Sequence, residues 1–174
     1  PISIASTYEK SGIGALSILT EKKYFKGNIE HISLVKNKTK IPILRKDFII
    51  DPYQVIQSKY YKADAILIIM SILSLSQAQE LLDAAKKYKI DCLVEVHTFK
   101  EINDALKLNN PTIGINNRNL SNLKVNLVNT NELYKEIPNE YTIIAESGIK
   151  TKKDIEDYNE LGIYNFLIGE TLLR

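Results

Sequence analysis

Polar side chains end or interrupt the aliphatic segments of this sequence, and their types suit acid–base chemistry. Lys46, Glu95 and Glu146 each lie at such a segment, where a charged side chain is rarely buried without a partner. A lysine ammonium donates protons, and burial and neighbours tune its acidity. Carboxyl groups donate or remove protons when they are held against a reacting group. With Asn116 as a polar positioning group, these residues predict a site for proton transfer.

Each candidate also has a structural interpretation that the sequence leaves open. Glu95 can serve as an ion-pair partner of Lys46, Asn116 as a cap at a strand end, and Arg118 as a solvated loop residue. His97 follows Glu95 by two residues and is expected at the same mouth. A single histidine without a second imidazole nearby in the sequence is a poor metal signal, so no metal site is predicted.

The segments that carry these residues alternate between strand and helix patterns. Strands are expected over 15–20, 41–46, 65–69, 92–96, 112–116, 142–146 and 164–168. Helices are expected over 2–11, 29–35, 52–61, 74–89, 98–108, 129–136 and 151–161, with a short helix from 169. N-capping side chains predict several of the helix starts, namely Asp51, Ser74, Thr98, Asn129 and Thr151.

Strict alternation with short connections predicts an α/β fold with a parallel sheet. A doubly wound sheet and a (β/α)8 TIM barrel both fit that pattern. Polar residues at the ends of several separate strands favour the barrel, in which every strand can direct a group to one mouth. Glycines at Gly148 and Gly169 follow the last two strands, where barrels often bind a phosphate on backbone N–H groups.

Composition fits one globular domain over residues 1–174. The net charge of +2 gives no argument for nucleic acid or for a membrane surface, and no apolar run approaches the length of a membrane span. Cys92 is the only cysteine, so no disulfide within the chain is possible and a reducing, cytoplasmic compartment is expected. The sequence begins at Pro1 inside a helix pattern, and we expect it to come from a longer natural chain.

A set of short motifs runs in order along essentially the whole chain. They are Tyr24–Gly27, Leu44–Ile49, Leu93–His97, Gly114–Leu120, Ala145–Ile149 and Ile168–Glu170. In order and spacing they resemble the indole-3-glycerol-phosphate synthase family. The resemblance implies a TIM barrel of tryptophan biosynthesis that acts on a phosphorylated small molecule, 1-(2-carboxyphenylamino)-1-deoxyribulose 5-phosphate. It implies closure of the indole ring with release of carbon dioxide and water, and no metal or organic cofactor.

The resemblance also implies roles for individual residues. Lys46 resembles the general acid of ring closure, Glu95 an acid–base group of the dehydration, and Glu146 the carboxylate that stabilises positive charge near the anilino nitrogen. Polar positioning is implied for Asn116 and Ser147, and substrate contact for Arg118. An apolar wall around the anthranilate ring is implied for Leu19, Phe25, Phe48 and Leu120. Backbone donors to the phosphate are implied at Gly148, Gly169 and Glu170.

The family's first-strand block, Glu-x-Lys-x-x-Ser-Pro-Ser, and its last helix are absent from this sequence. We therefore expect a partial barrel with seven of the eight strands, whose exposed edges favour self-association. Two alternatives stay open. One is a non-catalytic fragment that binds ligand or associates through its edges. The other is a different phosphate-binding barrel enzyme, such as a phosphoribosyl isomerase, which would need another acid–base pair and no apolar wall.

Overall fold

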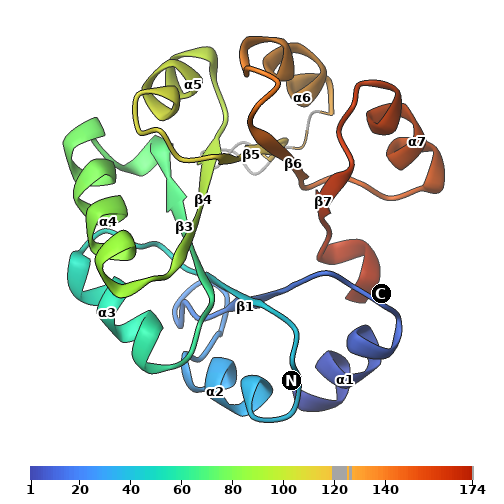
Figure 1. The fold of residues 1–174 in the computed structure, drawn as a ribbon. Helices are drawn as coiled ribbons and strands as arrows, with labels where there is room; N and C mark the ends of the chain where they lie inside the picture. Colours follow the sequence, from blue (N-terminus) through green and yellow to red (C-terminus); the bar gives the residue numbers. More distant parts are fainter. Residues whose placement is uncertain (119–124, 126, 174) are drawn as a thin grey trace. The chain divides into compact units, whose positions relative to one another are not determined.

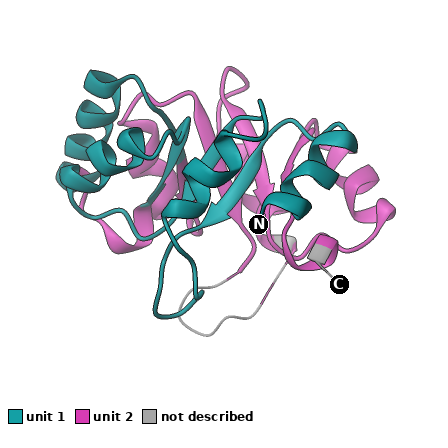
Figure 2. Ribbon diagram, turned by 90° about the horizontal axis from the view of Figure 1, so that it is seen from below, with its two compact units in different colours: residues 1–69, 76–93 teal, residues 70–75, 94–174 magenta. Residues whose placement is uncertain are grey.

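The computed structural model of the chain describes residues 1–118, 125 and 127–173. These residues form two compact units, coloured separately in Figure 2. Unit 1 comprises Pro1–Ile69 with Ser76–Leu93, and unit 2 comprises Met70–Leu75 with Val94–Arg174. The single domain expected over residues 1–174 stays a prediction.

Unit 1 alternates helices and strands from the N-terminus (Figure 1). Its elements are α1 (Ile2–Lys10), β1 (Leu16–Leu19), α2 (Glu30–Lys36), β2 (Ile43–Lys46), α3 (Pro52–Tyr60), β3 (Ala65–Ile69), most of α4 (Leu75–Tyr88) and the start of β4 (Asp91–Val96). β1 pairs with β2 and β2 with β3, both in parallel. Ile66 to Ile69 of β3 are buried, as expected for a parallel strand covered on both faces.

Unit 2 continues the alternation to the C-terminal side of the chain. Its elements are the 3₁₀ turn η1 (Met70–Ile72), the end of β4, α5 (Phe99–Leu106), β5 (Thr112–Asn116), α6 (Val128–Leu133), η2 (Tyr134–Glu136), β6 (Thr142–Glu146), α7 (Lys152–Glu160), β7 (Asn165–Leu167) and η3 (Glu170–Leu173). β4 pairs with β5, β5 with β6 and β6 with β7, all in parallel.

The strand order identifies the fold class. Within each unit the described strands neighbour one another in chain order, whereas a doubly wound sheet reverses its order at a switch point. Parallel neighbours in chain order, joined by helices, are the pattern of a (β/α) barrel. The prediction of a barrel with seven of its eight strands is therefore confirmed. None of the helices in the described part of the chain has the length and apolar composition of a membrane span.

Local capping chemistry explains where three of the described helices begin. As predicted, the side chains of Asp51 before α3, Thr98 before α5 and Thr151 before α7 each accept from a backbone N–H of the first turn. Asp51 and Thr151 also form complete capping boxes. The prediction for Asn129 is wrong, because α6 begins after Leu127 without a side-chain cap and Asn129 lies inside the helix. Its amide instead donates to the carbonyl groups of His97 and Asn116 at 3.3 Å, which fastens α6 to two strand ends.

The core of unit 2 determines which way the side chains of β6 point. Ala145 packs with Ile149, Tyr158 and Ile163 in a buried cluster between β6 and α7. Successive side chains of a strand point to opposite faces. Glu146 therefore lies on the face of β6 that is turned away from α7.

Candidate active site

Three predicted residues of unit 2 share one face of the sheet at the carboxyl ends of its strands. Glu95 is in register with Gly114, two residues before Asn116, and Asn116 is in register with Glu146. Residues in register or two apart along a strand point to the same face. Glu95 and Glu146 are each 1% exposed and Asn116 is 5% exposed. The structure thus brings two buried carboxyl groups and one carboxamide to the face turned away from α7.

The opposite face holds a buried polar network that the sequence analysis missed. The amide nitrogen of Asn117 lies 3.1 Å from the carbonyl oxygens of Glu146 and Ser147 and 3.1 Å from the Tyr158 hydroxyl. Its amide oxygen accepts from the hydroxyl of Thr130 at 2.8 Å and from the backbone N–H of Thr130 at 3.2 Å. The network joins the ends of β5 and β6 to α6 and α7, so it fixes where Asn116 and Glu146 lie.

The turn after β6 requires left-handed backbone. Ser147 has φ +64 and Gly148 has φ +83, a region that favours glycine. A Cβ atom on Gly148 would lie 2.4 Å from Val125 and 2.8 Å from Leu127. Gly148 therefore allows the segment after β5 to pack directly onto this turn, and Ser147 is half-buried beside Glu146.

The side chains of two loop residues form an ion pair at the same end of unit 2. Arg118 forms an ion pair with Glu170 at 3.1 Å, and both side chains are partly exposed at 34% and 58%. The carboxamide oxygen of Asn116 accepts from the Arg118 backbone N–H at 2.9 Å, which holds the start of the loop. Gly169 is exposed, so it leaves backbone accessible after β7.

His97 lies between two carboxyl groups. Its Nε2 atom is 3.4 Å from Oε1 of Glu95, and its Nδ1 atom is 3.2 Å from Oε2 of Glu101. The same Glu101 oxygen accepts from the backbone N–H of His97 at 2.8 Å. Burial by itself raises the pKa of Glu101. Hydrogen bonds from the side chain and backbone of His97 lower it and outweigh burial, so the pKa lies below its ordinary value.

In unit 1, Lys46 is the last residue of β2 and is placed by its neighbour Arg45. Arg45 is 4% exposed and donates from Nη1 to the Gln54 carbonyl and the Ser58 hydroxyl of α3, both at 3.0 Å. Because strand side chains alternate, Lys46 lies on the face of β2 turned away from α3. Its backbone carbonyl accepts from the Thr20 N–H at 3.2 Å, which ties it to the end of β1.

Three of the four residues predicted to contact the anthranilate ring lie in unit 1. Leu19 is in register with Lys46, and the rings of Phe25 and Phe48 are 6.2 Å apart between centroids. The Phe25 loop passes close to β1, because a Cβ atom on Gly27 would lie 2.4 Å from the Leu19 carbonyl oxygen. Leu19 and Phe25 are exposed, at 39% and 52%. Leu120, the fourth predicted member, lies outside the described residues.

The structure therefore describes the predicted site as two sets. In unit 1, Lys46 is in register with Leu19, and the rings of Phe25 and Phe48 contact each other. Unit 2 brings together the polar strand ends and loop residues. Convergence of the two sets on one mouth stays a prediction.

Other reactive groups do not add a metal centre to the described ranges. Among residues 1–118, 125 and 127–173, no cluster of three or more His, Cys, Asp or Glu side chains has a metal-binding arrangement. Burial, together with the negative charge of Asp91, raises the pKa of the Cys92 thiol to about 12. Cys92 is therefore a neutral packing residue at physiological pH, since the thiolate is the reactive form.

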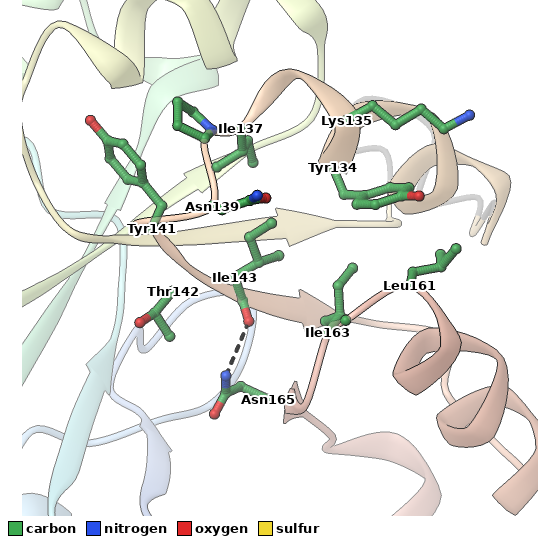
Figure 3. Close-up of a pocket in the computed structure, with 12 residues that line it drawn as sticks. Tyr134, Lys135, Ile137, Asn139, Tyr141, Thr142, Ile143, Leu161, Ile163 and Asn165 are labelled. Atoms are coloured by element: carbon green, nitrogen blue, oxygen red, sulfur yellow. Dashed lines mark hydrogen bonds between the residues drawn. The ribbon is translucent and has the colours of Figure 1, made fainter.

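A cavity of about 440 Å³ lies at the other end of the unit 2 strands (Figure 3). Its lining includes Thr142, Ile143, Ile163 and Asn165, and the Asn165 amide donates to the Ile143 carbonyl at 3.4 Å. Thr142 begins β6 and Glu146 ends it, a separation of roughly 13 Å along a strand. The cavity is therefore distinct from the strand ends that carry Asn116 and Glu146.

Solved structures with little sequence similarity share this fold. N-acetylmannosamine-6-phosphate 2-epimerase from Clostridium perfringens has a TM-score of 0.75 at 17% identity, over 98% of this chain and 78% of that one. The KGPDC protein from Streptococcus mutans has a TM-score of 0.72 at 12% identity, over 97% and 81% of the two chains. At these identities the likeness supports the fold alone.

One family is much more similar to this chain in sequence than these solved structures are. The family model described as indole-3-glycerol phosphate synthase matches residues 1–174. The indole-3-glycerol phosphate synthase of Zymomonas mobilis subsp. pomaceae is 44% identical over all of this chain and 66% of its own length. That of Dehalococcoides mccartyi is 45% identical over 99% of this chain and 68% of its own length. The chain thus spans about two thirds of the curated relatives it matches, and it belongs to the indole-3-glycerol phosphate synthase family.

Proposed function

We propose that the protein is an indole-3-glycerol-phosphate synthase, a carboxy-lyase that converts 1-(2-carboxyphenylamino)-1-deoxyribulose 5-phosphate to indole-3-glycerol phosphate. Family membership over residues 1–174 carries this proposal. The buried carboxyl groups on one face of unit 2 support it, because an acid–base reaction needs such groups in a site shielded from water.

The chemistry assigns a task to each polar group. Ring closure places a proton on the substrate carbonyl oxygen, for which Lys46 is the proposed acid. The carboxylate then leaves as carbon dioxide. Dehydration places a proton on the departing hydroxyl group and removes one from a ring carbon, for which Glu95 is the proposed acid–base group. Each turnover therefore takes up one proton from solvent.

Glu146 is proposed to stabilise positive charge near the anilino nitrogen. Its ionised form suits that task, since opposite charges attract strongly in a site of low dielectric constant. Asn116 and Ser147 are proposed as its polar neighbours, and their positions beside Glu146 in the ladder and in the chain support this.

Contacts are proposed at both ends of the substrate, the anthranilate ring and the phosphate group. Leu19, Phe25, Phe48 and Leu120 would contact the anthranilate ring, and Arg118 the polar groups near it. The backbone of Gly148, Gly169 and Glu170 would hold the phosphate, supported by the left-handed turn at Gly148 and the exposure of Gly169. A cytoplasmic location, the absence of a cofactor and self-association through strand edges stay predictions.

Turnover of the full-length protein tests the proposal. Purified protein is mixed with the proposed substrate, formation of the indole ring is followed by fluorescence, and the product indole-3-glycerol phosphate is identified by mass spectrometry. We expect one carbon dioxide released for each indole-3-glycerol phosphate formed. A protein that binds the substrate without converting it would favour the ligand-binding alternative. Isomerisation of a phosphoribosyl substrate instead would favour the other barrel enzyme.

A further inference from the structure

Glu95, His97 and Glu101 form a line of proton-exchanging groups from β4 to α5. The two imidazole nitrogens each face one carboxyl group, at 3.4 Å for Glu95 and 3.2 Å for Glu101. The two carboxyl groups come from different elements, since Glu95 lies on β4 and Glu101 in the first turn of α5. The amide of Asn129 donates to the His97 carbonyl at 3.3 Å, so the backbone at the centre of the line is also fixed.

Solvent exposure rises along this line. The side chain of Glu95 is 1% exposed, that of His97 is 10% exposed and that of Glu101 is 17% exposed. A carboxyl group as buried as Glu95 exchanges protons with water most readily through a neighbouring group. His97 is the next group toward solvent, and its imidazole ring can accept a proton on one nitrogen and donate one from the other.

The Glu101 carboxylate determines which imidazole nitrogen faces Glu95. It accepts from the backbone N–H of His97 and lies beside Nδ1, so the Nδ1 proton is the one it holds. The Nε2 atom is buried and makes no hydrogen bond within the described residues. Its distance from Glu95 is slightly longer than a hydrogen bond, and such distances often shorten when substrate binds.

We propose that His97 is a positioning residue that relays protons between the buried carboxyl group of Glu95 and solvent, with Glu101 holding its imidazole ring. The inference rests on the proposed function, in which Glu95 donates one proton and removes another during dehydration and must therefore begin each dehydration in the correct protonation state. A proton that leaves Glu95 goes to Nε2, and the Nδ1 proton goes to Glu101 and from there to water. In the reverse direction, a proton from water passes through Glu101 to Nδ1 while Nε2 gives its proton to Glu95, which reloads Glu95 and returns the imidazole to its starting state.

Substitution of His97 tests the relay in the full-length protein. His97→Gln keeps the backbone N–H and a side chain of similar length but cannot carry a proton between two partners. We expect turnover to fall at least ~10-fold while KM changes by less than ~3-fold, because a proton-transfer step is slowed and substrate contacts remain. His31→Gln, the matched change at the other histidine of this sequence, should leave both constants unchanged.

Chemical rescue separates a relay from a packing role. His97→Ala leaves space beside Glu95, and added imidazole should restore turnover several-fold, at about 50 mM, because it supplies the missing proton carrier. The same addition should not stimulate wild type or His31→Gln. Unchanged turnover in His97→Gln, or a folded His97→Ala variant that imidazole does not rescue, would overturn the relay.

A measurement on the wild-type protein tests the proposal even if the His97 variants do not fold. Nitrogen-15 NMR of the His97 ring reports which nitrogen carries the proton. We expect Nδ1 to be protonated both with and without a product analogue, and an unprotonated Nδ1 would overturn the proposal. Failure of the proposed function has a different signature, since wild type itself would then form no indole product.

Discussion

Arg45 donates from Nη2 to the carboxylate of Asp47 at 2.9 Å, although a single residue separates them in the chain. That residue is Lys46, and it is held on the opposite face of β2 by this pairing. Thr20 adds a hydrogen bond to the same Asp47 oxygen at 2.6 Å, so the ends of β1 and β2 are fixed together. The position of the proposed acid thus depends on a buried pair that takes no part in proton transfer.

Replacing one member of this pair should be costly. The Arg45 and Asp47 side chains are 5% and 11% exposed, so Asp47→Asn leaves a buried guanidinium with a weakened partner. We expect the free energy of unfolding to fall by about 3–5 kcal/mol in urea denaturation. Glu156→Gln, in the exposed pair with Lys152, is the matched control and should cost less than about 1 kcal/mol. Equal effects of the two substitutions would contradict the assigned role.

The Asn117 network predicts that two substitutions within it differ in their cost to stability. Asn117→Asp has nearly the same shape but lacks the amide donor that faces the carbonyl groups of Glu146 and Ser147. We expect it to cost at least about 3 kcal/mol of unfolding free energy, since it places a buried charge against acceptors. Tyr158→Phe removes one hydroxyl from the same network and should cost about 1 kcal/mol. If the aspartate variant is as stable as wild type, the network does not hold the strand ends.

A pair of glycines separates backbone strain from packing at the turn after β6. Gly148 and Gly162 have nearly the same φ, +83 and +81, but a Cβ atom on Gly162 meets open space. Gly162→Ala should therefore cost about 1–2 kcal/mol, from left-handed backbone alone. Gly148→Ala should cost clearly more, because its methyl group meets Val125 and Leu127. Equal losses in thermal or urea unfolding would show that this contact carries no energy.

Acid titration tests the contact between His97 and Glu101. Because the folded pKa of Glu101 lies below its ordinary value of 4.5, its ionised form adds stability above that pH. This stability is lost as pH falls through the lower folded pKa. We expect the difference in unfolding free energy between wild type and Glu101→Gln to shrink as pH drops from 6 to below 4.5. A difference that stays constant over this range would mean that the hydrogen bonds do not favour the ionised carboxylate.

The sequence predicted the strands well because buried parallel strands are nearly continuous aliphatic runs. β3, β5 and β6 have the predicted bounds, and the acidic residues that interrupt or end such runs were the signal for Glu95 and Glu146. Sequence reasoning missed Arg45 and Asn117, and the strand and helix partners of Asn117 lie 29 to 41 positions away along the chain. Arginine next to Lys46 in a buried strand was a signal for the first, since only a paired arginine is buried there.

Long-range competition explains the remaining error. Asn129 has the residue type of an N-cap, but two strand-end carbonyl groups compete for its amide and the helix begins before it. The sequence around Asn129 does not indicate this competition, because the two carbonyl groups belong to residues 32 and 13 positions earlier in the chain. The ion pair between Arg118 and Glu170 was likewise hidden, because 52 positions separate the two residues.

The turnover of a Lys46→Met variant in the full-length protein tests the central claim most directly. Methionine keeps the length of the side chain and removes its charge and protons. The account predicts that kcat for indole-3-glycerol phosphate formation falls at least about 100-fold, while the variant folds as wild type and binds a product analogue with unchanged affinity. A folded variant that binds the analogue normally and retains near wild-type turnover would contradict the account, because Lys46 would then be structural.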